Sequence, residues 1–309
     1  MLHQNEKPKV IIICGPTGIG KTSTAIEIAE KFKGEIIGAD SMQIYRYMDI
    51  GTAKPAAEQR ARVTHHMIDI VDPDEHFDAV KYATLGREKM LQLHSNGICP
   101  FVVGGTGLYI KALLHGMFES QPIDPQIRKR LNEKAAAHGS DFLHQRLRQL
   151  DPETAKRLHP NDTYRIIRAL ETIEATGKSI SEYHHAHRFS EEPFDVLKLG
   201  LNMDKAKLYQ RINQRVNVMI AAGFVDEVKK LLSMGYSSDL KSMQSIGYRH
   251  MVDYIEGRLR WQECLETLKR DHRRYAKRQL TWFGTDDEII WKEPGHLDEM
   301  TKLIEEFLR

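Results

Sequence analysis

The chain contains five short apolar runs that have the length and composition of buried β-strands. They are rich in Ile, Val and Leu and lie at residues 10–14, 35–38, 100–103, 197–201 and 288–291. Segments with helical spacing of their apolar residues separate the early runs, so that strands and helices alternate. This alternation predicts an α/β domain built on a parallel sheet with helices on both faces. In such sheets ligands bind at the carboxyl ends of the strands.

A different pattern occupies residues 122–194, where the helical spacing continues but no strand-like run is present. Asp162 is placed to cap the start of one of these helices, which ends near Gly177. Its basic and apolar residues fall on opposite faces. We therefore expect an all-helical insertion domain at residues 122–194, within a discontinuous core formed by residues 1–121 and 195–309.

The first apolar run ends in a glycine-rich segment, GPTGIGKT, that matches the phosphate-binding loop (P-loop) pattern G-x-x-x-x-G-K-[ST]. A strand-like run before it and a helical pattern after it favour this interpretation over a turn without a ligand. Backbone N–H groups of such a loop surround a phosphate, the lysine adds charge, and the hydroxyl after the lysine suits Mg²⁺. The fold is therefore predicted to be P-loop NTPase-like, and the expected diphosphate- or nucleotide-binding residues are Gly15, Pro16, Thr17, Gly18, Ile19, Gly20, Lys21 and Thr22, with Thr22 as metal ligand.

Composition narrows the class of protein without deciding its function. The 309 residues are 41% hydrophobic and 28% charged, as in ordinary globular proteins. No apolar run approaches the roughly 20 residues that span a bilayer, and the N-terminus lacks a signal-peptide core, so we expect a cytoplasmic protein without membrane contact. Three scattered cysteines predict neither a disulfide framework nor a zinc site. The adjacent His65 and His66 are interpreted as structural, since a third ligand at zinc-like spacing is missing.

Two polar segments follow strand-like runs and should therefore lie at the same sheet edge as the P-loop. Asp40 comes after the run at 35–38 and has Ser41 and Gln43 beside it. It could assist Mg²⁺, act as a general base, or only cap the strand end; the neighbouring P-loop favours one of the first two roles. Thr106 lies in a second glycine-rich turn, where it is either a substrate contact or part of an ordinary strand-to-helix turn.

Basic residues cluster on two predicted helices. Arg211 and Arg215 are four residues apart and share a face, which is either solvated or suited to a diphosphate. Residues 269–278, KRDHRRYAKR, hold six basic residues and one acidic residue, a formal charge of +5 against +2 for the whole chain. Such a stripe favours the phosphate backbone of a nucleic acid over a solvated helix face. The expected contacts include Lys269, Arg273, Arg274, Lys277 and Arg278.

Together these motifs resemble the bacterial tRNA dimethylallyltransferases (tRNA isopentenyltransferases) over nearly the whole chain. The P-loop alone occurs in many families, whereas ADSMQIYR combined with GTAKP and YAKRQLTWF is far more specific. The matching segments are GPTGIGKT (15–22), ADSMQIYR (39–46), GTAKP (51–55), HHMIDIVDP (65–73), GGTGLY (104–109), NDTYRIIRALE (161–171), QSIGYR (244–249) and RRYAKRQLTWF (273–283).

The resemblance implies a reaction and its partners. A dimethylallyl group passes from dimethylallyl diphosphate to N6 of the adenosine on the 3′ side of the anticodon, in tRNAs that read UNN codons. Diphosphate is released and Mg²⁺ assists. The partners are therefore the tRNA anticodon stem-loop and dimethylallyl diphosphate, and we expect the helical insertion and the basic stripe to hold the stem-loop. Since nothing in the sequence requires a dimer, we expect a monomer.

The resemblance also assigns roles to matching positions. Thr17, Lys21, Asp40 and Arg215 become the catalytic residues: Asp40 accepts or orients the N6 proton, and Arg215, with Arg211 as the alternative, contacts the leaving group. The implied tRNA-binding positions are Asp40, Ser41, Met42, Gln43, Thr106, Arg128, Tyr164, Arg165, Ile166, Ile167, Arg168, Gln244, Ser245, Ile246, Gly247, Tyr248 and Arg249.

Two other functions are compatible with parts of the sequence. A P-loop kinase of a small molecule would explain the loop and Asp40, but not the basic helix. A non-catalytic RNA-binding P-loop protein would explain the basic helix and leave Asp40 without a task.

Overall fold

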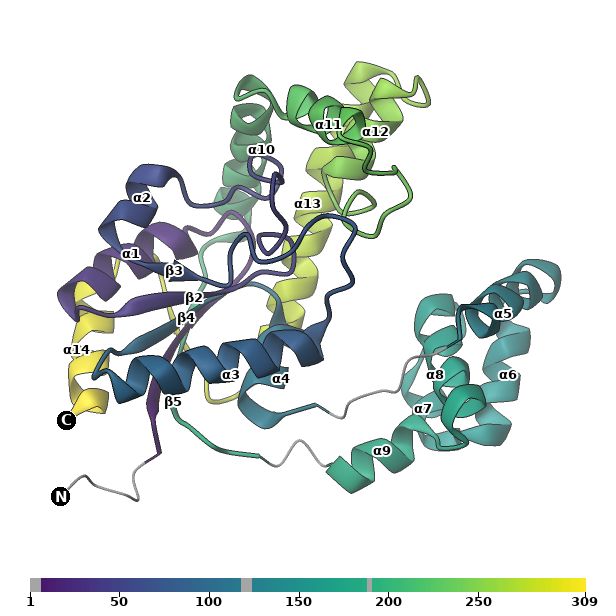
Figure 1. Cartoon of the computed structure of the whole chain (residues 1–309), viewed down its shortest axis with the longest axis horizontal. Helices are drawn as coiled ribbons and strands as arrows, with labels where there is room; N and C mark the ends of the chain where they lie inside the picture. The colour runs from purple at the N-terminus through teal and green to yellow at the C-terminus, as the bar shows by residue number, and fades with distance from the viewer. Residues whose placement is uncertain (1–6, 118–123, 188–190) are drawn as a thin grey trace. The chain divides into compact units, whose positions relative to one another are not determined.

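The computed structural model describes residues 7–117, 124–187 and 191–309, which form two compact units (Figure 1). The first unit comprises Met1–Leu114 and Glu192–Arg309, and the second is the intervening His115–Glu191. The boundary expected between residues 121 and 122 lies outside the described residues. The expected resumption of the core at residue 195 coincides with the first residue of a strand.

A single parallel sheet of six strands organises the first unit, in the order β3-β2-β4-β1-β5-β6. The five apolar runs all form strands, with ends that differ from the expected ones by no more than two residues. A very short edge strand at the two adjacent histidines was not expected from the sequence, because two residues are too few to show any alternation. The strands are β1 (Lys9–Cys14), β2 (Glu35–Ala39), β3 (His65–His66), β4 (Pro100–Gly104), β5 (Asp195–Leu201) and β6 (Ile290–Lys292).

Helices cover both faces of this sheet, which confirms the predicted α/β class (Figure 1). On one face α1 packs against β1, β2 and β4 and also contacts α14, whereas α3 contacts β2 and β4 from the other face. The helices that follow the first four strands and the last one are α1 (Lys21–Lys31), α2 (Ala57–Arg62), α3 (Ala79–Ser95), α4 (Gly107–His115) and α14 (Leu297–Leu308).

The burial of β1 shows why its sequence is continuously apolar. Ile11 and Ile13 pack with Ile26 of α1 and Met300 of α14 in one core cluster. Ile12, which points to the opposite face, is 1% exposed. A strand that is covered on both sides has no polar face, and this is typical of the central strands of parallel sheets.

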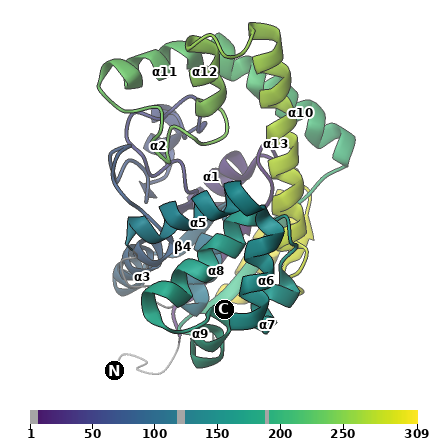
Figure 2. The same ribbon diagram turned by 90° about the vertical axis from the view of Figure 1, so that its right-hand side faces the viewer.

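Four helices form a second layer in the same unit. They are α10 (Lys205–Ala221), α11 (Phe224–Ser233), α12 (Tyr248–Ile255) and α13 (Trp261–Phe283), and α13 contacts both α10 and α12 (Figure 2). The 23-residue α13 buries Cys264, Leu268, His272 and Ala276, at intervals of four residues. Its basic stripe is therefore the exposed side of an amphipathic helix.

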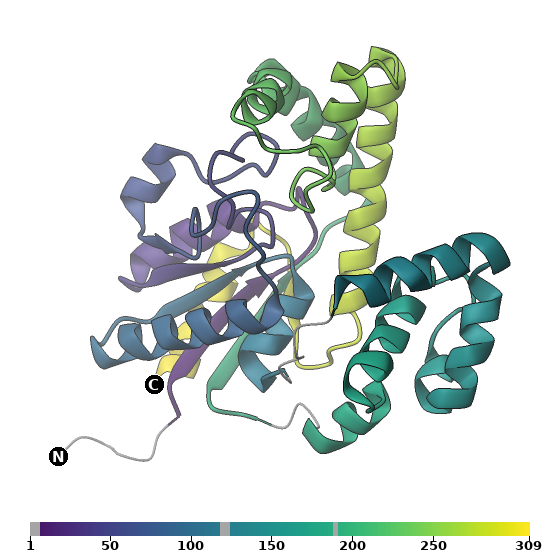
Figure 3. The ribbon, with the colours of Figure 1, turned by 45° about the vertical axis from the view of Figure 1, so that its right-hand side comes forward.

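The described residues of the second unit form helices and no strand (Figure 3). These helices are α5 (Pro125–His138), α6 (Ser140–Leu150), α7 (Pro152–Arg157), α8 (Thr163–Thr176) and α9 (Ile180–His187). Leu131, Leu143 and Ile166 belong to its core. The Asp162 side chain accepts a hydrogen bond at the start of α8, and Gly177 ends that helix with φ at 71°, both as expected. Within the described part of the chain, no helix is both long and apolar enough to cross a bilayer.

Candidate active site

The P-loop joins β1 to α1 through glycines whose conformation other residues rarely adopt. Gly15 has φ at 146°, and a Cβ there would lie 2.7 Å from the carbonyl oxygen of Leu201. Gly20 caps α1 with φ at 108°, so the loop leads directly into the helix N-terminus. Ile19, one of the expected binding residues, is fully buried in the hydrophobic core. Its side chain therefore serves packing, and only its backbone is available to a phosphate.

Two half-buried cations lie beside this loop. The Lys21 Nζ donates to the carbonyl of Pro16 at 2.9 Å, and the Arg215 Nη1 donates to the Thr17 hydroxyl at 3.2 Å. Burial lowers the pKa of Lys21 to about 8 and also lowers the pKa of Arg215, while the nearby charge of Asp40 acts in the opposite direction. Among the described residues, no carboxylate forms an ion pair with either cation. Two half-buried positive charges without a carboxylate partner in the described part of the chain, next to a P-loop, favour binding of an anion.

Arg211, the alternative to Arg215, lies one turn earlier on α10. A Cβ built on Gly20 would be 3.2 Å from its Nη2, so this guanidinium also reaches the P-loop. Arg211 is exposed, whereas the Nε of Arg215 is buried and has no hydrogen-bond partner among the described residues. The enclosure of Arg215 supports it as the stronger candidate for a leaving-group contact.

Asp40 follows the last residue of β2, at the same edge of the sheet. Its Oδ1 accepts a hydrogen bond from the backbone N–H of Met42 at 2.9 Å. In the part of the chain that the structure describes, its Oδ2 has no hydrogen-bond partner. Capping of the strand end therefore uses one oxygen of the Asp40 carboxylate. The other oxygen is available to accept a proton or to bind a cation.

Thr106 connects the ends of β2 and β4. Its hydroxyl accepts from the backbone N–H of Ser41 at 3.0 Å, and its own N–H donates to the carbonyl of Ala39 at 3.1 Å. The residue thus has a structural task in the second glycine-rich turn, which the sequence left undecided, and contact with a substrate stays a prediction.

Gln279 of α13 is a site residue that sequence reasoning missed. It is 6% exposed, accepts the Thr17 N–H at 2.8 Å and donates to the carbonyl of Gly105 at 2.8 Å. One amide side chain therefore joins the P-loop to the turn after β4. The signal for it in the sequence is its position: Gln279 comes three residues after Ala276 and therefore lies on the buried side of α13, opposite the basic stripe.

A cavity of about 1270 Å³ brings these groups together. Its charged and polar lining includes Lys21, Thr22, Asp40, Arg215 and Gln279, and its apolar lining includes Ile50, Ala53, Val218, Met219 and Ala222. Thr22 and Asp40 supply oxygen donors, which suit a hard cation such as Mg²⁺. No group of three or more His, Cys, Asp or Glu side chains is arranged around a metal position in the described ranges, so a cation here would depend on oxygens of its ligand.

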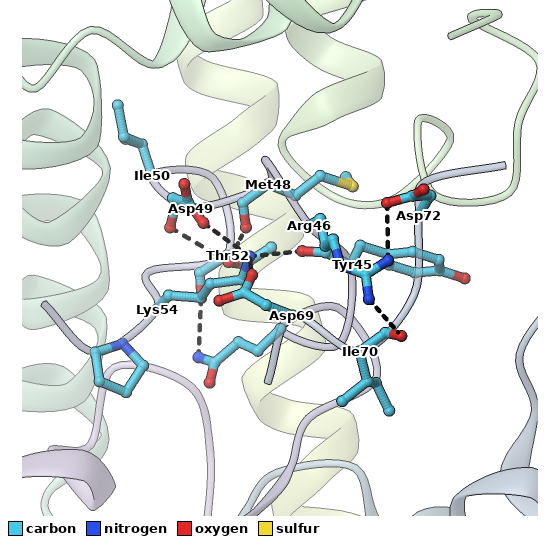
Figure 4. A network of polar contacts seen from close by, with 12 residues as sticks. Tyr45, Arg46, Met48, Asp49, Ile50, Thr52, Lys54, Asp69, Ile70 and Asp72 are labelled. Carbon is cyan, nitrogen blue, oxygen red and sulfur yellow. Dashed lines mark hydrogen bonds and ion pairs between the residues drawn. The ribbon is translucent and has the colours of Figure 1, made fainter. Parts of the chain in front are cut away.

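The loop after β2 is held by a polar network around the buried Lys54 side chain, which the sequence did not reveal (Figure 4). The Lys54 Nζ donates to the carbonyl of Tyr45 and to the carboxylates of Asp49 and Asp69. Its side chain is 2% exposed, and Arg60 also pairs with Asp69. In the sequence, Lys54 is the lysine of the GTAKP segment, to which the family resemblance gave no role. The network fixes a loop that forms part of the cavity wall.

The expected RNA-contact segment 244–249 is partly buried. Gln244 is exposed, and Arg249 is half-buried and paired with Asp271. Tyr248, in contrast, is 0% exposed, and its hydroxyl donates to Glu227. The expectation that its side chain contacts RNA is therefore wrong, because this side chain is part of the core.

The basic stripe of α13 is mostly accessible. Arg274, Lys277 and Arg278 are exposed, Lys269 is half-buried, and the Arg273 Nη1 donates to the Asn213 side chain at 2.7 Å. The stripe therefore offers several cations to a polyanion.

In the helical unit, some of the expected RNA contacts are exposed and others are buried. Tyr164 is 71% exposed. The buried carboxylate of Glu171 accepts two hydrogen bonds from Arg128, of 2.5 and 2.8 Å, and also contacts Arg168. Ile166 and Ile167 are 0% and 5% exposed and lie in the core of the unit. Their side chains therefore cannot contact RNA, since they form the apolar face of α8, whereas Arg165 is exposed.

Comparison with known proteins connects this geometry to a family. The family model described as IPP transferase matches residues 43–286, and the model described as isopentenyl transferase matches residues 8–71. The chain belongs to the IPP transferase family.

Similar proteins share nearly the full length of the chain. It is 52% identical to the tRNA dimethylallyltransferase of Desulfosudis oleivorans over 98% of this chain and 97% of that protein, and 50% identical to that of Geobacter sulfurreducens over 97% of each. The solved tRNA isopentenylpyrophosphate transferase of Bacillus halodurans is 40% identical with a TM-score of 0.73, covering 98% and 97% of the two chains. A eukaryotic dimethylallyltransferase acting on tRNA is 30% identical with a TM-score of 0.77, covering 94% of this chain and 75% of that one.

Proposed function

We propose that this IPP transferase family member transfers a dimethylallyl group from dimethylallyl diphosphate to N6 of the adenosine 3′-adjacent to the anticodon, in tRNAs reading UNN codons. The observation that carries the proposal is a shared cavity with two cations, Lys21 and Arg215, and the carboxylate of Asp40, whose Oδ2 accepts no hydrogen bond from the described residues. Relatives named tRNA dimethylallyltransferase, at about 50% identity over nearly the full chain, support this reaction.

The diphosphate end of the donor would bind at residues 15–22. Backbone N–H groups of the loop and the N-terminus of α1 would surround the phosphates. Lys21 and Arg215 would neutralise the charge that grows on the leaving group as its bond to carbon breaks. Thr22 would supply a hydroxyl to Mg²⁺, which when bound adds positive charge to the leaving diphosphate.

The acceptor would bind on the Asp40 side of the cavity. The lone pair of N6 attacks C1 of the dimethylallyl group, and the C1–O bond breaks with its electrons leaving on the diphosphate. The proton from N6 passes to the free Oδ2 of Asp40. Thr17, whose hydroxyl accepts from Arg215, would keep that guanidinium beside the breaking bond.

The rest of the tRNA would bind to basic and polar side chains. Arg274, Lys277 and Arg278 of α13 are exposed, and Tyr164 of the helical unit offers an exposed ring to a base. Ser41, Met42 and Gln43 would contact the adenosine, which must leave its stack to enter a cavity. We also propose that the protein acts as a cytoplasmic monomer.

Transfer of label from radiolabelled dimethylallyl diphosphate to unmodified tRNA, with Mg²⁺ and without ATP, tests this function. We expect label on a tRNA with adenosine 3′ of its anticodon, and none when that base is changed to guanosine. Transfer to both RNAs would contradict the assigned acceptor. The absence of any transfer, together with ATP consumption on a small acceptor, would favour a kinase.

A further inference from the structure

One carboxylate outside the cavity collects an unusual number of hydrogen bonds. The Glu227 side chain of α11 accepts from the backbone N–H groups of Asp49 and Ile50, at 2.9 and 2.6 Å, through Oε2. Its Oε1 accepts from the N–H of Gly51 at 3.0 Å and from the hydroxyl of Tyr248 at 2.6 Å. No lysine, arginine or histidine among the described residues forms an ion pair with Glu227. The carboxylate is thus satisfied by four neutral donors, three of which belong to one loop.

Close packing holds this loop against the carboxylate. A Cβ on Gly51 would lie 2.2 Å from Cε2 of Phe224 and 2.5 Å from Cε2 of Tyr248. Those two rings meet edge to face, with centroids 5.1 Å apart. The backbone at Gly51 is therefore pressed onto two buried aromatic rings, and only glycine fits. The segment has little freedom to move away from Glu227.

The next residue carries this contact into the active site. The carbonyl of Thr52 accepts from the Gln43 side chain at 3.2 Å and lies 3.5 Å from Nη2 of Arg215. The Thr52 hydroxyl donates to the carbonyl of Met48 at 2.6 Å and closes the turn (Figure 4). Arg215 itself reaches Thr17 of the P-loop. A continuous path therefore runs from Glu227 through residues 49–52 to Arg215.

We propose that Glu227 is a positioning residue, which sets the backbone of residues 49–52 so that the Thr52 carbonyl orients the Arg215 guanidinium toward the diphosphate. The proposal rests on the proposed function of Arg215. Its physical basis is that, among the described residues, the hydrogen-bond acceptors of the Arg215 guanidinium are two neutral oxygens, those of the Thr17 hydroxyl and the Thr52 carbonyl, so its orientation depends on where those oxygens are held. A carboxylate is required at 227 because all four partners are donors, and an amide would place an NH₂ group against at least one of them.

Replacing Glu227 by glutamine tests this role at nearly constant volume. Glu227→Gln should weaken binding of inorganic pyrophosphate with Mg²⁺ by about tenfold, the effect expected for one misplaced charge-assisted contact. In prenyl transfer, kcat should fall while the KM for tRNA stays nearly unchanged. The matched control is Asp226→Asn, the preceding exposed residue of α11, which should leave both quantities at the wild-type value.

A double-mutant cycle separates positioning from general destabilisation. If Glu227 acts through Arg215, then Glu227→Gln should add little further loss to Arg215→Lys, because the group that it positions has already been changed. Additive losses would overturn the proposal, as would wild-type pyrophosphate affinity in Glu227→Gln. The thermal unfolding midpoint of each variant gives the temperature range in which it is folded, and binding and kinetics are compared within that range.

The pyrophosphate measurement also keeps this inference separate from the proposed function. A wild-type protein that binds pyrophosphate but transfers no prenyl group would contradict the prenyl transferase proposal. The comparison of Glu227→Gln with Asp226→Asn in pyrophosphate binding would still decide whether Glu227 positions the diphosphate site.

Discussion

Asp40 illustrates how one residue divides its two oxygens between structure and chemistry. Asp40→Asn keeps an oxygen for the Met42 N–H but removes the base, so it separates the two tasks. We expect turnover to fall by about 10²- to 10⁴-fold, the range for loss of a general base, while binding of pyrophosphate and tRNA changes little. Single-turnover kinetics and filter binding measure both quantities. An Asn variant with wild-type turnover would exclude Asp40 as the base.

His272 is a buried residue whose proton uptake should affect stability. Its Nε2 has no partner within the described ranges, and burial, then Arg215 and His250, lower its pKa from 6.5 to about 3, against the opposing charge of Asp271. His272 is protonated at a higher pH in the unfolded chain than in the folded chain. The contribution of its neutral imidazole to the free energy of unfolding is therefore fully present above pH 6.5 and is lost as the pH falls toward about 3.

The size of this loss can be measured in a variant without the imidazole. Between about pH 6.5 and pH 5, His272 should cost up to about 1.4 kcal/mol of unfolding free energy per pH unit. Urea unfolding at several pH values should therefore show a shallower acid-side slope in His272→Asn than in the wild type. Equal slopes would mean that another group dominates the acid loss.

At the scale of elements, α13 combines a buried structural side with an exposed basic side. Gln279→Leu would leave the Thr17 N–H and the Gly105 carbonyl without partners, so we expect a loss of about 2–4 kcal/mol in unfolding free energy. Urea unfolding measures it. Gln262→Leu, at an exposed position of the same helix, is the control and should change stability little.

In α8, Glu171 holds two arginines that are candidate RNA contacts. Glu171→Gln removes a negative charge, which by itself would strengthen RNA binding. We nevertheless expect affinity for the anticodon stem-loop to fall several-fold, because Arg128 loses its bidentate partner and its orientation. Fluorescence anisotropy measures the change.

The neighbouring Glu174 provides the control for this experiment. It pairs with Arg130 and Arg146, neither of which is a predicted RNA contact. Glu174→Gln should therefore bind RNA as well as the wild type or slightly better. A gain of affinity in Glu171→Gln would show that charge alone matters at that position.

At the scale of the whole molecule, the net charge conceals a strongly uneven distribution. The chain carries +2 overall, but +5 falls within ten residues of α13. Arg274→Ala should weaken tRNA binding most at low salt and lower the slope of log K against log salt by about 0.7–0.9, the value for one phosphate contact. The control is Lys302→Ala at an exposed position of α14, which should leave the slope unchanged. An unchanged slope in Arg274→Ala would show that Arg274 does not contact a phosphate of the tRNA.

Much of the fold could be predicted because its signals are local. Strands such as β1 are buried on both faces, so their sequence is continuously apolar, and the P-loop glycines are required by backbone conformation within a few residues. The two-residue β3 is too short to leave a pattern. Motif matches do not say which side chains point inward, and Ile167 and Tyr248 proved to be core residues; Ile166 is also in the core, on the face that its helical spacing predicted to be buried.

By itself, the sequence determined the class of fold, the P-loop with its lysine, and the position of Asp40 at a strand end. Only the tertiary structure decided what these groups contact. Thr17 meets Gln279 across 262 residues and Arg215 across 198, and Gly51 meets Glu227 across 176. Local patterns report the conformation of neighbouring residues. A hydrogen bond between distant segments depends instead on how helices and sheet pack, and that is set by the burial of the whole core.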